Sequence, residues 1–139
     1  MGCHGLIEPA NPALSSLAVT AAPPDDGFLS TMEVFRLRIP ADLVVLSACE
    51  TGRDTYVEGE GMTGLVRAFM FAGAPRVIAS LWRVDDAATS ALMKEFYARW
   101  AKNEPAAKAL KAAQDFVRGK PEWSHPKFWA AWNLFGLPD

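Results

Sequence analysis

The sequence has few of the residues from which disulfide frameworks and metal centres are built. Its 139 residues include two cysteines and two histidines, too few for a disulfide framework. A metal site would need Cys3, His4, Cys49 and His125 to converge without any paired spacing, so we expect no metal. The spacing of the two cysteines gives no signal for a bond between them, although it leaves one open.

Long apolar runs and a strong net charge are also missing. No apolar stretch approaches the length of a membrane span, and no basic and apolar leader opens the chain. The formal net charge is −2, which gives no reason to expect nucleic acid or an anionic membrane as a partner. We expect no membrane or nucleic-acid partner and a soluble, cytoplasmic protein.

What remains has the composition of an ordinary globular domain. Half of the residues are hydrophobic and 22% are charged, and no repeat or low-complexity tract interrupts the chain. A length of 139 residues suffices for a substantial core. We therefore expect one domain over residues 1–139.

The most informative segment is the apolar run from Leu43 to Cys49, which Glu50, Thr51 and Gly52 follow. A Val-rich run bounded by turn residues predicts a buried strand, and ligands bind parallel sheets beyond the carboxyl ends of their strands. A thiol at that position is held rigidly yet faces the site, as a nucleophile requires. The alternative is that Cys49 is a small buried hydrophobic residue.

Hydrophobic periodicity predicts an α/β fold. Apolar residues at helical spacing from Met62, with Gly73 as terminator, and a second strand over 76–82 complete a parallel strand–helix–strand unit. Before it, we expect a short edge strand over 17–19 and a helix that Ser30 caps.

Two more helices and a strand are expected after this unit. Asp85 and Asp86 open one helix, Asn103 caps the other, and the last strand covers 128–135, although its alanines leave some helical ambiguity. His125 and the proline after it would fix the approach to that strand.

His4 precedes Gly5 near the start of the chain. If His4 ends a strand parallel to the Cys49 strand, the imidazole would emerge at the same sheet edge. It could then hold the thiolate and protonate the departing amine, while the backbone N–H groups of Gly5 and Cys49 stabilise an oxyanion. The alternative is that a histidine four residues from a terminus is frayed and has no function.

Four segments together resemble the CHAT family of caspase-like proteins: CHG at 3–5, LVVLSACETG at 43–52, the stretch from 59 to 97, and HPKFWAAWNLFG at 125–136. The resemblance implies that His4 and Cys49 form a catalytic dyad without any cofactor. It implies a caspase-like three-layer sandwich, a mostly parallel sheet with helices on both faces. Because the strand that carries the histidine normally precedes it, we expect this chain to lack N-terminal strands.

The same resemblance suggests partners and roles. It implies a cysteine endopeptidase of protein or peptide substrates, attached to an upstream sensor or helical-repeat region in bacterial signalling or defence. Arg83, Asp85 and Asp86 would line a specificity pocket that selects basic or acidic side chains, with helix capping as the alternative for the two aspartates. A non-catalytic regulatory or interaction domain is the second hypothesis, and an open sheet edge predicts self-association.

Overall fold

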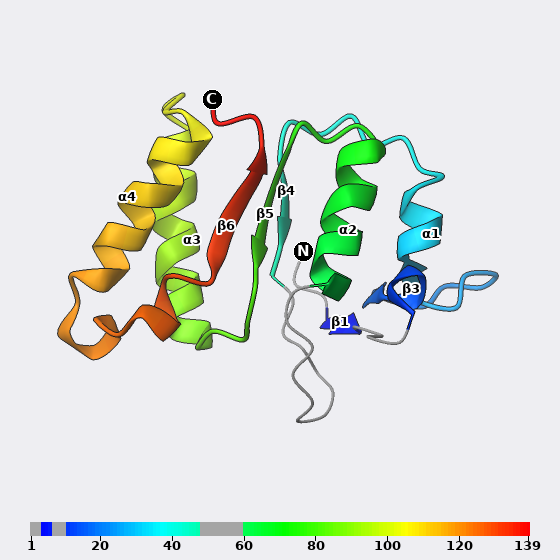
Figure 1. Ribbon diagram of the computed structural model, residues 1–139, viewed down its shortest axis with the longest axis horizontal. Helices are drawn as coiled ribbons and strands as arrows, with labels where there is room; N and C mark the ends of the chain where they lie inside the picture. Colours follow the sequence, from blue (N-terminus) through cyan, green and yellow to red (C-terminus); the bar gives the residue numbers. More distant parts are fainter. Residues whose placement is uncertain (1–3, 7–10, 48–59) are drawn as a thin grey trace.

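The computed structural model describes residues 4–6, 11–47 and 60–139 (Figure 1). Within these ranges the strands form two three-stranded sheets, ordered β1-β2-β3 and β4-β5-β6. The strands are β1 (His4–Leu6), β2 (Ser16–Ala18), β3 (Phe28–Ser30), β4 (Val44–Leu46), β5 (Arg76–Ser80) and β6 (Trp132–Gly136). The α-helices are α1 (Thr31–Val34), α2 (Glu60–Phe71), α3 (Asp86–Trp100) and α4 (Ala106–Arg118), and the 3₁₀ helices are η1 (Pro12–Leu14), η2 (Pro121–Trp123) and η3 (Pro126–Phe128).

The strand–helix–strand unit expected from the sequence is confirmed. β4 and β5 are parallel, with Val44 opposite Val77 and Leu46 opposite Ala79, and α2 lies between them in the chain. β6 returns antiparallel to β5 and pairs along its whole length. The α/β class is therefore correct. The expectation of a mostly parallel sheet does not hold for the described strands, because β4–β5 is parallel and the other three strand pairings are antiparallel.

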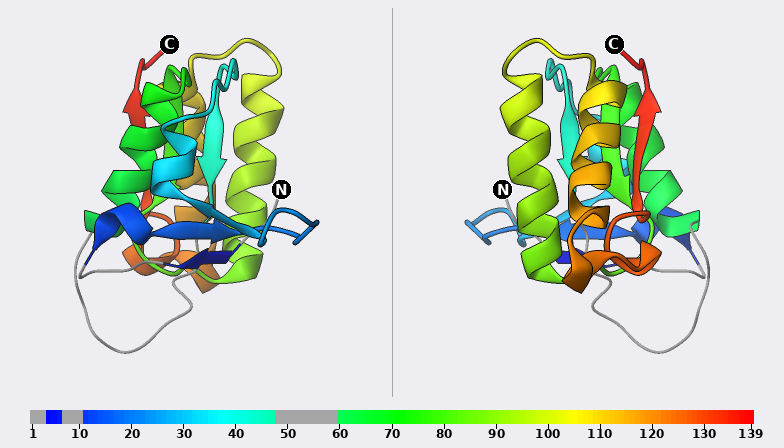
Figure 2. Two further views of the ribbon diagram at one scale, coloured as in Figure 1. Left: turned by 90° about the vertical axis from the view of Figure 1, so that its right-hand side faces the viewer. Right: turned by 90° about the vertical axis from the view of Figure 1, so that its left-hand side faces the viewer.

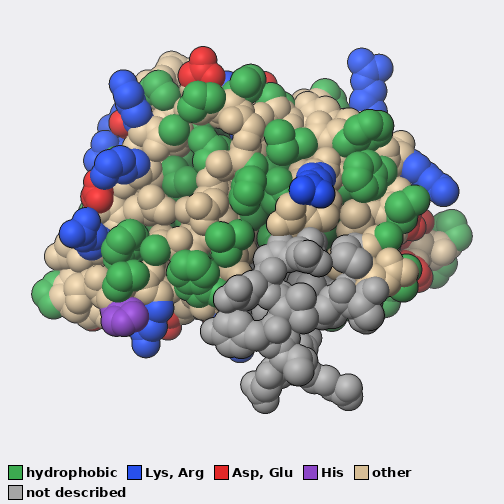
Figure 3. Space-filling model, in the orientation of Figure 1, with side chains coloured by type: hydrophobic (Ala, Val, Ile, Leu, Met, Phe, Trp, Pro, Cys, Tyr) green, Lys and Arg blue, Asp and Glu red, His purple; other side chains and the backbone are tan. Residues whose placement is uncertain are grey.

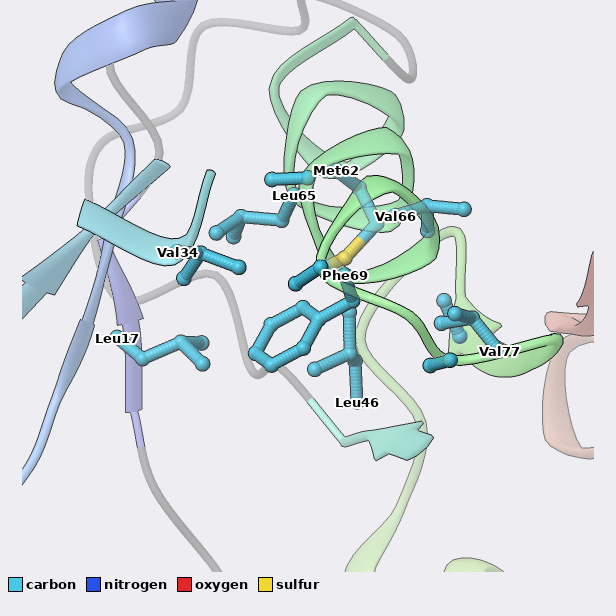
Figure 4. Packing of buried hydrophobic residues seen from close by; sticks show 12 residues of the cluster. Leu17, Val34, Leu46, Met62, Leu65, Val66, Phe69 and Val77 are labelled. Carbon is cyan, nitrogen blue, oxygen red and sulfur yellow. The ribbon is translucent and has the colours of Figure 1, made fainter. Parts of the chain in front are cut away.

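Helices cover both faces of the β4-β5-β6 sheet. Because successive side chains of a strand point to opposite faces, β5 contributes apolar side chains to a core on each side. Val77 and Ala79 join a core with α1, α2 and β2, which Figure 4 shows from close by. Ile78 belongs to a second core with α3, α4 and Trp132. The three residues are all fully buried, so β5 is the strand around which both cores form.

Local signals account for the helix ends that the sequence predicts. Ser30 caps α1 in a complete capping box: its Oγ accepts a hydrogen bond from the Glu33 N–H at 3.2 Å, and its own N–H donates to Glu33 Oε2 at 2.8 Å. Gly73 ends α2 with a φ of +117°, which L side chains rarely adopt. The N–H of Ala74 then reaches the Phe69 carbonyl, which completes a Schellman motif.

Three further expectations need correction. β2 is the central strand of its sheet, since it pairs with β1 and β3. Pro105 occupies the N-cap of α4, while Asn103 adopts a left-handed φ of 61° just beyond α3. The last strand begins at Trp132 because Pro126 opens η3 and its carbonyl accepts the Ala130 N–H.

Candidate functional site

Of the two residues of the expected dyad, only His4 lies within the described residues. Cys49 lies outside the described residues, so its position relative to His4 stays a prediction. The backbone of His4 begins β1 and pairs with Ala18, and Gly5 pairs with Leu17. β1 thus belongs to the antiparallel sheet and, within the described chain, does not pair with β4.

The two sheets nevertheless meet at one end of the molecule. The parallel strands β4 and β5 both direct their carboxyl ends toward the end of the molecule where the β1-β2-β3 sheet lies (Figures 1 and 2). Leu46 ends β4 three positions before Cys49 in the sequence. The chain therefore leaves β4 toward the end that holds β1, at the sheet edge where parallel sheets bind ligands.

A cavity of about 470 Å³ opens where the chain leaves β5 and enters α3. Its lining brings together the three predicted pocket residues and three others: Arg83, Val84, Asp85, Asp86, Lys127 and Phe128. Val84 is buried, whereas Arg83, Asp85 and Asp86 are exposed. A charged cavity with an apolar wall suits a side chain that carries a polar end group.

The two aspartates of this cavity have different tasks. Asp85 is the N-cap of α3: its Oδ1 accepts hydrogen bonds from the N–H groups of Ala87 and Ala88, both at 3.0 Å. The capping role is thereby confirmed. Asp86 is the first residue of α3, and none of the ion pairs found among the described residues includes it, Arg83 or Lys127. These three charges remain available to a ligand.

Sequence reasoning missed Lys127 and Phe128, which η3 contributes from more than 40 positions further along the chain. Trp82 fastens η3 to the loop after β5, because its Nε1 donates a hydrogen bond to the Lys127 carbonyl at 3.1 Å. His125 caps η3 by accepting the Lys127 N–H at Nδ1, which agrees with its expected role before the last strand. The Lys127 ammonium lies 4.7 Å from the Phe128 ring centroid.

No metal centre emerges from the described part of the chain, where no three His, Cys, Asp or Glu residues are arranged to hold an ion. Nor does any helix in this part have the length and apolar composition needed to cross a membrane.

Comparison with known proteins identifies the family. The profile of the CHAT domain matches residues 1–137, nearly the whole chain. The chain belongs to the CHAT domain family. Tetratricopeptide repeat protein 28 of Homo sapiens is 34% identical over 125 residues, which are 90% of this chain and 5% of that protein. The Mus musculus protein of the same name is 33% identical over the same shares of both chains.

The alignment makes this CHAT domain similar to a small part of much longer proteins. The chain spans about 5% of the length of the curated relatives it matches, and their names describe tetratricopeptide repeats. The family match includes His4, Gly5 and Cys49, the residues that carry the expected chemistry.

Proposed function

We propose that this CHAT domain is a caspase-like cysteine endopeptidase and that Cys49 and His4 are its catalytic dyad. The Cys49 thiolate attacks the scissile carbonyl carbon, and the N–H groups of Gly5 and Cys49 stabilise the oxyanion that forms. His4 donates a proton to the departing amine, which leaves a thioester on Cys49. Water activated by His4 then hydrolyses the thioester, releases the carboxylic acid and restores the thiol. The mechanism needs no cofactor.

The observation that carries this proposal is the family match over residues 1–137, which includes both dyad residues. The fold supports it: β4 and β5 are parallel, helices pack on both faces of their sheet, and β1 lies at the end toward which β4 runs. Such an arrangement is consistent with a caspase-like sandwich in which His4 and Cys49 approach each other at the carboxyl edge of the sheet.

We assign the cavity beside α3 to substrate selection. Because Asp85 is engaged by the backbone of α3, Asp86 is the carboxylate that would pair with a Lys or Arg side chain. Arg83 and Lys127 would instead pair with an acidic side chain. Whether the cavity selects a basic or an acidic side chain then depends on whether Asp86 or the pair Arg83 and Lys127 lies nearer to that side chain.

A non-catalytic regulatory or interaction module is the alternative. Such a module would be one part of a longer protein, as in the tetratricopeptide repeat proteins of which 5% aligns with this chain. In such a protein the CHAT domain would transmit or receive a signal from a helical-repeat region and cleave nothing.

Peptide hydrolysis separates the two functions. The chain is incubated with a fluorogenic peptide library, alongside Cys49→Ala, His4→Ala and the matched control Cys3→Ala. We expect hydrolysis by the unmodified chain and by Cys3→Ala, and a loss of at least about 100-fold in each dyad variant. No hydrolysis by any form would favour the interaction module, whereas hydrolysis that survives Cys49→Ala would rule out Cys49 as the nucleophile.

A further inference from the structure

The end of α2 exposes large apolar side chains that the rest of the described chain does not cover. Phe71 is 75% exposed and Met70 is 37% exposed. Figure 3 shows hydrophobic side chains gathered over α2 and the neighbouring segment, with a Lys or Arg side chain among them. Single exposed apolar side chains are common on folded domains, but exposed apolar side chains that adjoin one another mark interaction surfaces.

Helical spacing joins these side chains into one face. Arg67, Met70 and Phe71 are related by three and four positions and therefore lie together on α2. The opposite face of α2 is buried through Leu65, Ala68 and other residues of the first core. The exposed face is thus left over after α2 has packed against its sheet.

The segment after α1 extends this face. The rings of Phe35 and Phe71 meet edge to face, with centroids 5.4 Å apart. The N–H of Ile39 donates to the Ala72 carbonyl at 2.7 Å, which holds the neighbouring Arg38 near the end of α2. We call the set Phe35, Arg38, Arg67, Met70 and Phe71 the Phe71 surface.

The charge on this surface has a single sign. Arg38 and Arg67 are exposed, and neither takes part in the ion pairs found across the described residues. The Asp and Glu side chains visible in Figure 3 lie toward the margins of the view. Arg67 on the same helix face as Phe71, and Arg38 on the adjoining segment, suit a partner that offers carboxylates next to apolar side chains.

We propose that the Phe71 surface binds an acidic amphipathic helix of a protein partner. The apolar stripe of that helix covers Phe71 and Met70, while Glu or Asp side chains beside the stripe pair with Arg38 and Arg67. A second copy of the chain fits less well, because face-to-face pairing would bring like charges together. An anionic membrane also fits less well, because binding to anionic lipid takes a cluster of about 4–8 Lys and Arg side chains and this surface has only Arg38 and Arg67.

A synthetic peptide tests the proposal independently of catalysis. The probe is a fluorescein-labelled helical peptide of about 18 residues, or five turns, with leucines on one face and glutamates on both sides of them. Its partner peptide carries lysine in place of every glutamate. We expect the glutamate peptide to bind the chain at least about tenfold more tightly, and the preference to shrink as salt screens the charges.

Variants then locate the binding site. Phe71→Ser and Arg67→Glu should each weaken binding of the glutamate peptide about tenfold, and Arg67→Glu should improve binding of the lysine peptide. The matched control is Phe116→Ser, because Phe116 is a 43% exposed ring on α4, across the sheet from α2. Circular dichroism checks that every variant is folded.

Three results would overturn the proposal. The first is equal affinity for the two peptides, or binding that Phe71→Ser and Arg67→Glu leave unchanged. The second is concentration-dependent dimerisation that Phe71→Ser abolishes, which would assign the surface to a second copy. The third is Phe71-dependent binding to phosphatidylserine vesicles without binding of either peptide, which would assign it to a membrane.

Discussion

β4 and β5 are neighbouring parallel strands, and the entirely apolar β4 is less buried than β5, which contains Arg76 and Ser80. Of the five residues of β5, the four from Val77 to Ser80 are buried, whereas only Leu46 is buried in β4. β5 has a paired strand on each side, while β4 pairs on one side only within the described residues. A run of valines therefore indicates a strand, but only the neighbours of that strand decide how much of it is protected from water.

The two strands also lead into different segments of the chain. After β5 comes a loop that ends in a capped helix, with Asp85 bound to the backbone of α3. β4 leads toward Cys49, where we place the reactive thiol. The better-protected strand leads to the cavity beside α3, which we propose selects the substrate, and the less protected one would carry the nucleophile.

The largest expected effect comes from truncating matched valines in the two strands. Val77 and Val44 face each other in the register and contact the same core, but Val77 is fully buried and Val44 only partly. We expect Val77→Ala to lower the free energy of unfolding by about 2–3 kcal/mol and Val44→Ala by about 1 kcal/mol, measured by urea denaturation. Equal losses of unfolding free energy would show that β4 is protected from water to the same degree as β5.

A second test addresses the chain beyond β4. If His4 helps to hold Cys49 as the thiolate, iodoacetamide should alkylate Cys49 about tenfold faster than an ordinary thiol at pH about 7. Cys3 is the internal reference, and peptide mapping separates the two rates. Slow alkylation of Cys49 beside fast alkylation of Cys3 would support the interpretation of Cys49 as a buried hydrophobic residue.

A third test addresses the chain beyond β5. Asp85→Ala removes the acceptor of two backbone N–H groups and should cost about 1 kcal/mol of stability, whereas Asp85→Asn keeps a good N-cap and should cost little.

If Asp86 selects basic side chains, Asp86→Asn should remove that preference from a peptide-library profile while Asp85→Asn leaves it. A loss caused by Asp85→Asn instead would show that the capping residue also reads the substrate.

Sequence reasoning succeeded where the signal was local. The capping box at Ser30 and the glycine that ends α2 each depend on residues a few positions apart, and β4, α2 and β5 each show their own local hydrophobic pattern. The start of β6 was misplaced because the run from Phe128 to Phe135 is apolar at almost every position, so its periodicity marks no boundary.

The cavity could be predicted only in part. Arg83, Asp85 and Asp86 come directly after a strand, where the family resemblance placed a specificity pocket, but Lys127 and Phe128 join them through the tertiary contact between Trp82 and η3. A hydrogen bond across 45 positions leaves no pattern in a single sequence. For the dyad, the family resemblance supplied the residues, and the alkylation rate of Cys49 tests whether His4 lies close enough to act on it.

The smallest expected effect concerns the capping box that precedes β4. Hydrogen bonds from the Ser30 side chain and then from its backbone N–H hold the pKa of Glu33 below its ordinary value. A lowered pKa in the folded state contributes stability that is present above the ordinary pKa and is lost as the pH falls through the lowered one. Glu33→Gln should therefore lower the melting temperature slightly at neutral pH, and the difference from the unmodified chain should disappear in acid, where Glu33 is protonated. A difference that persists unchanged at low pH would show that the box contributes through its geometry and not through the charge of Glu33.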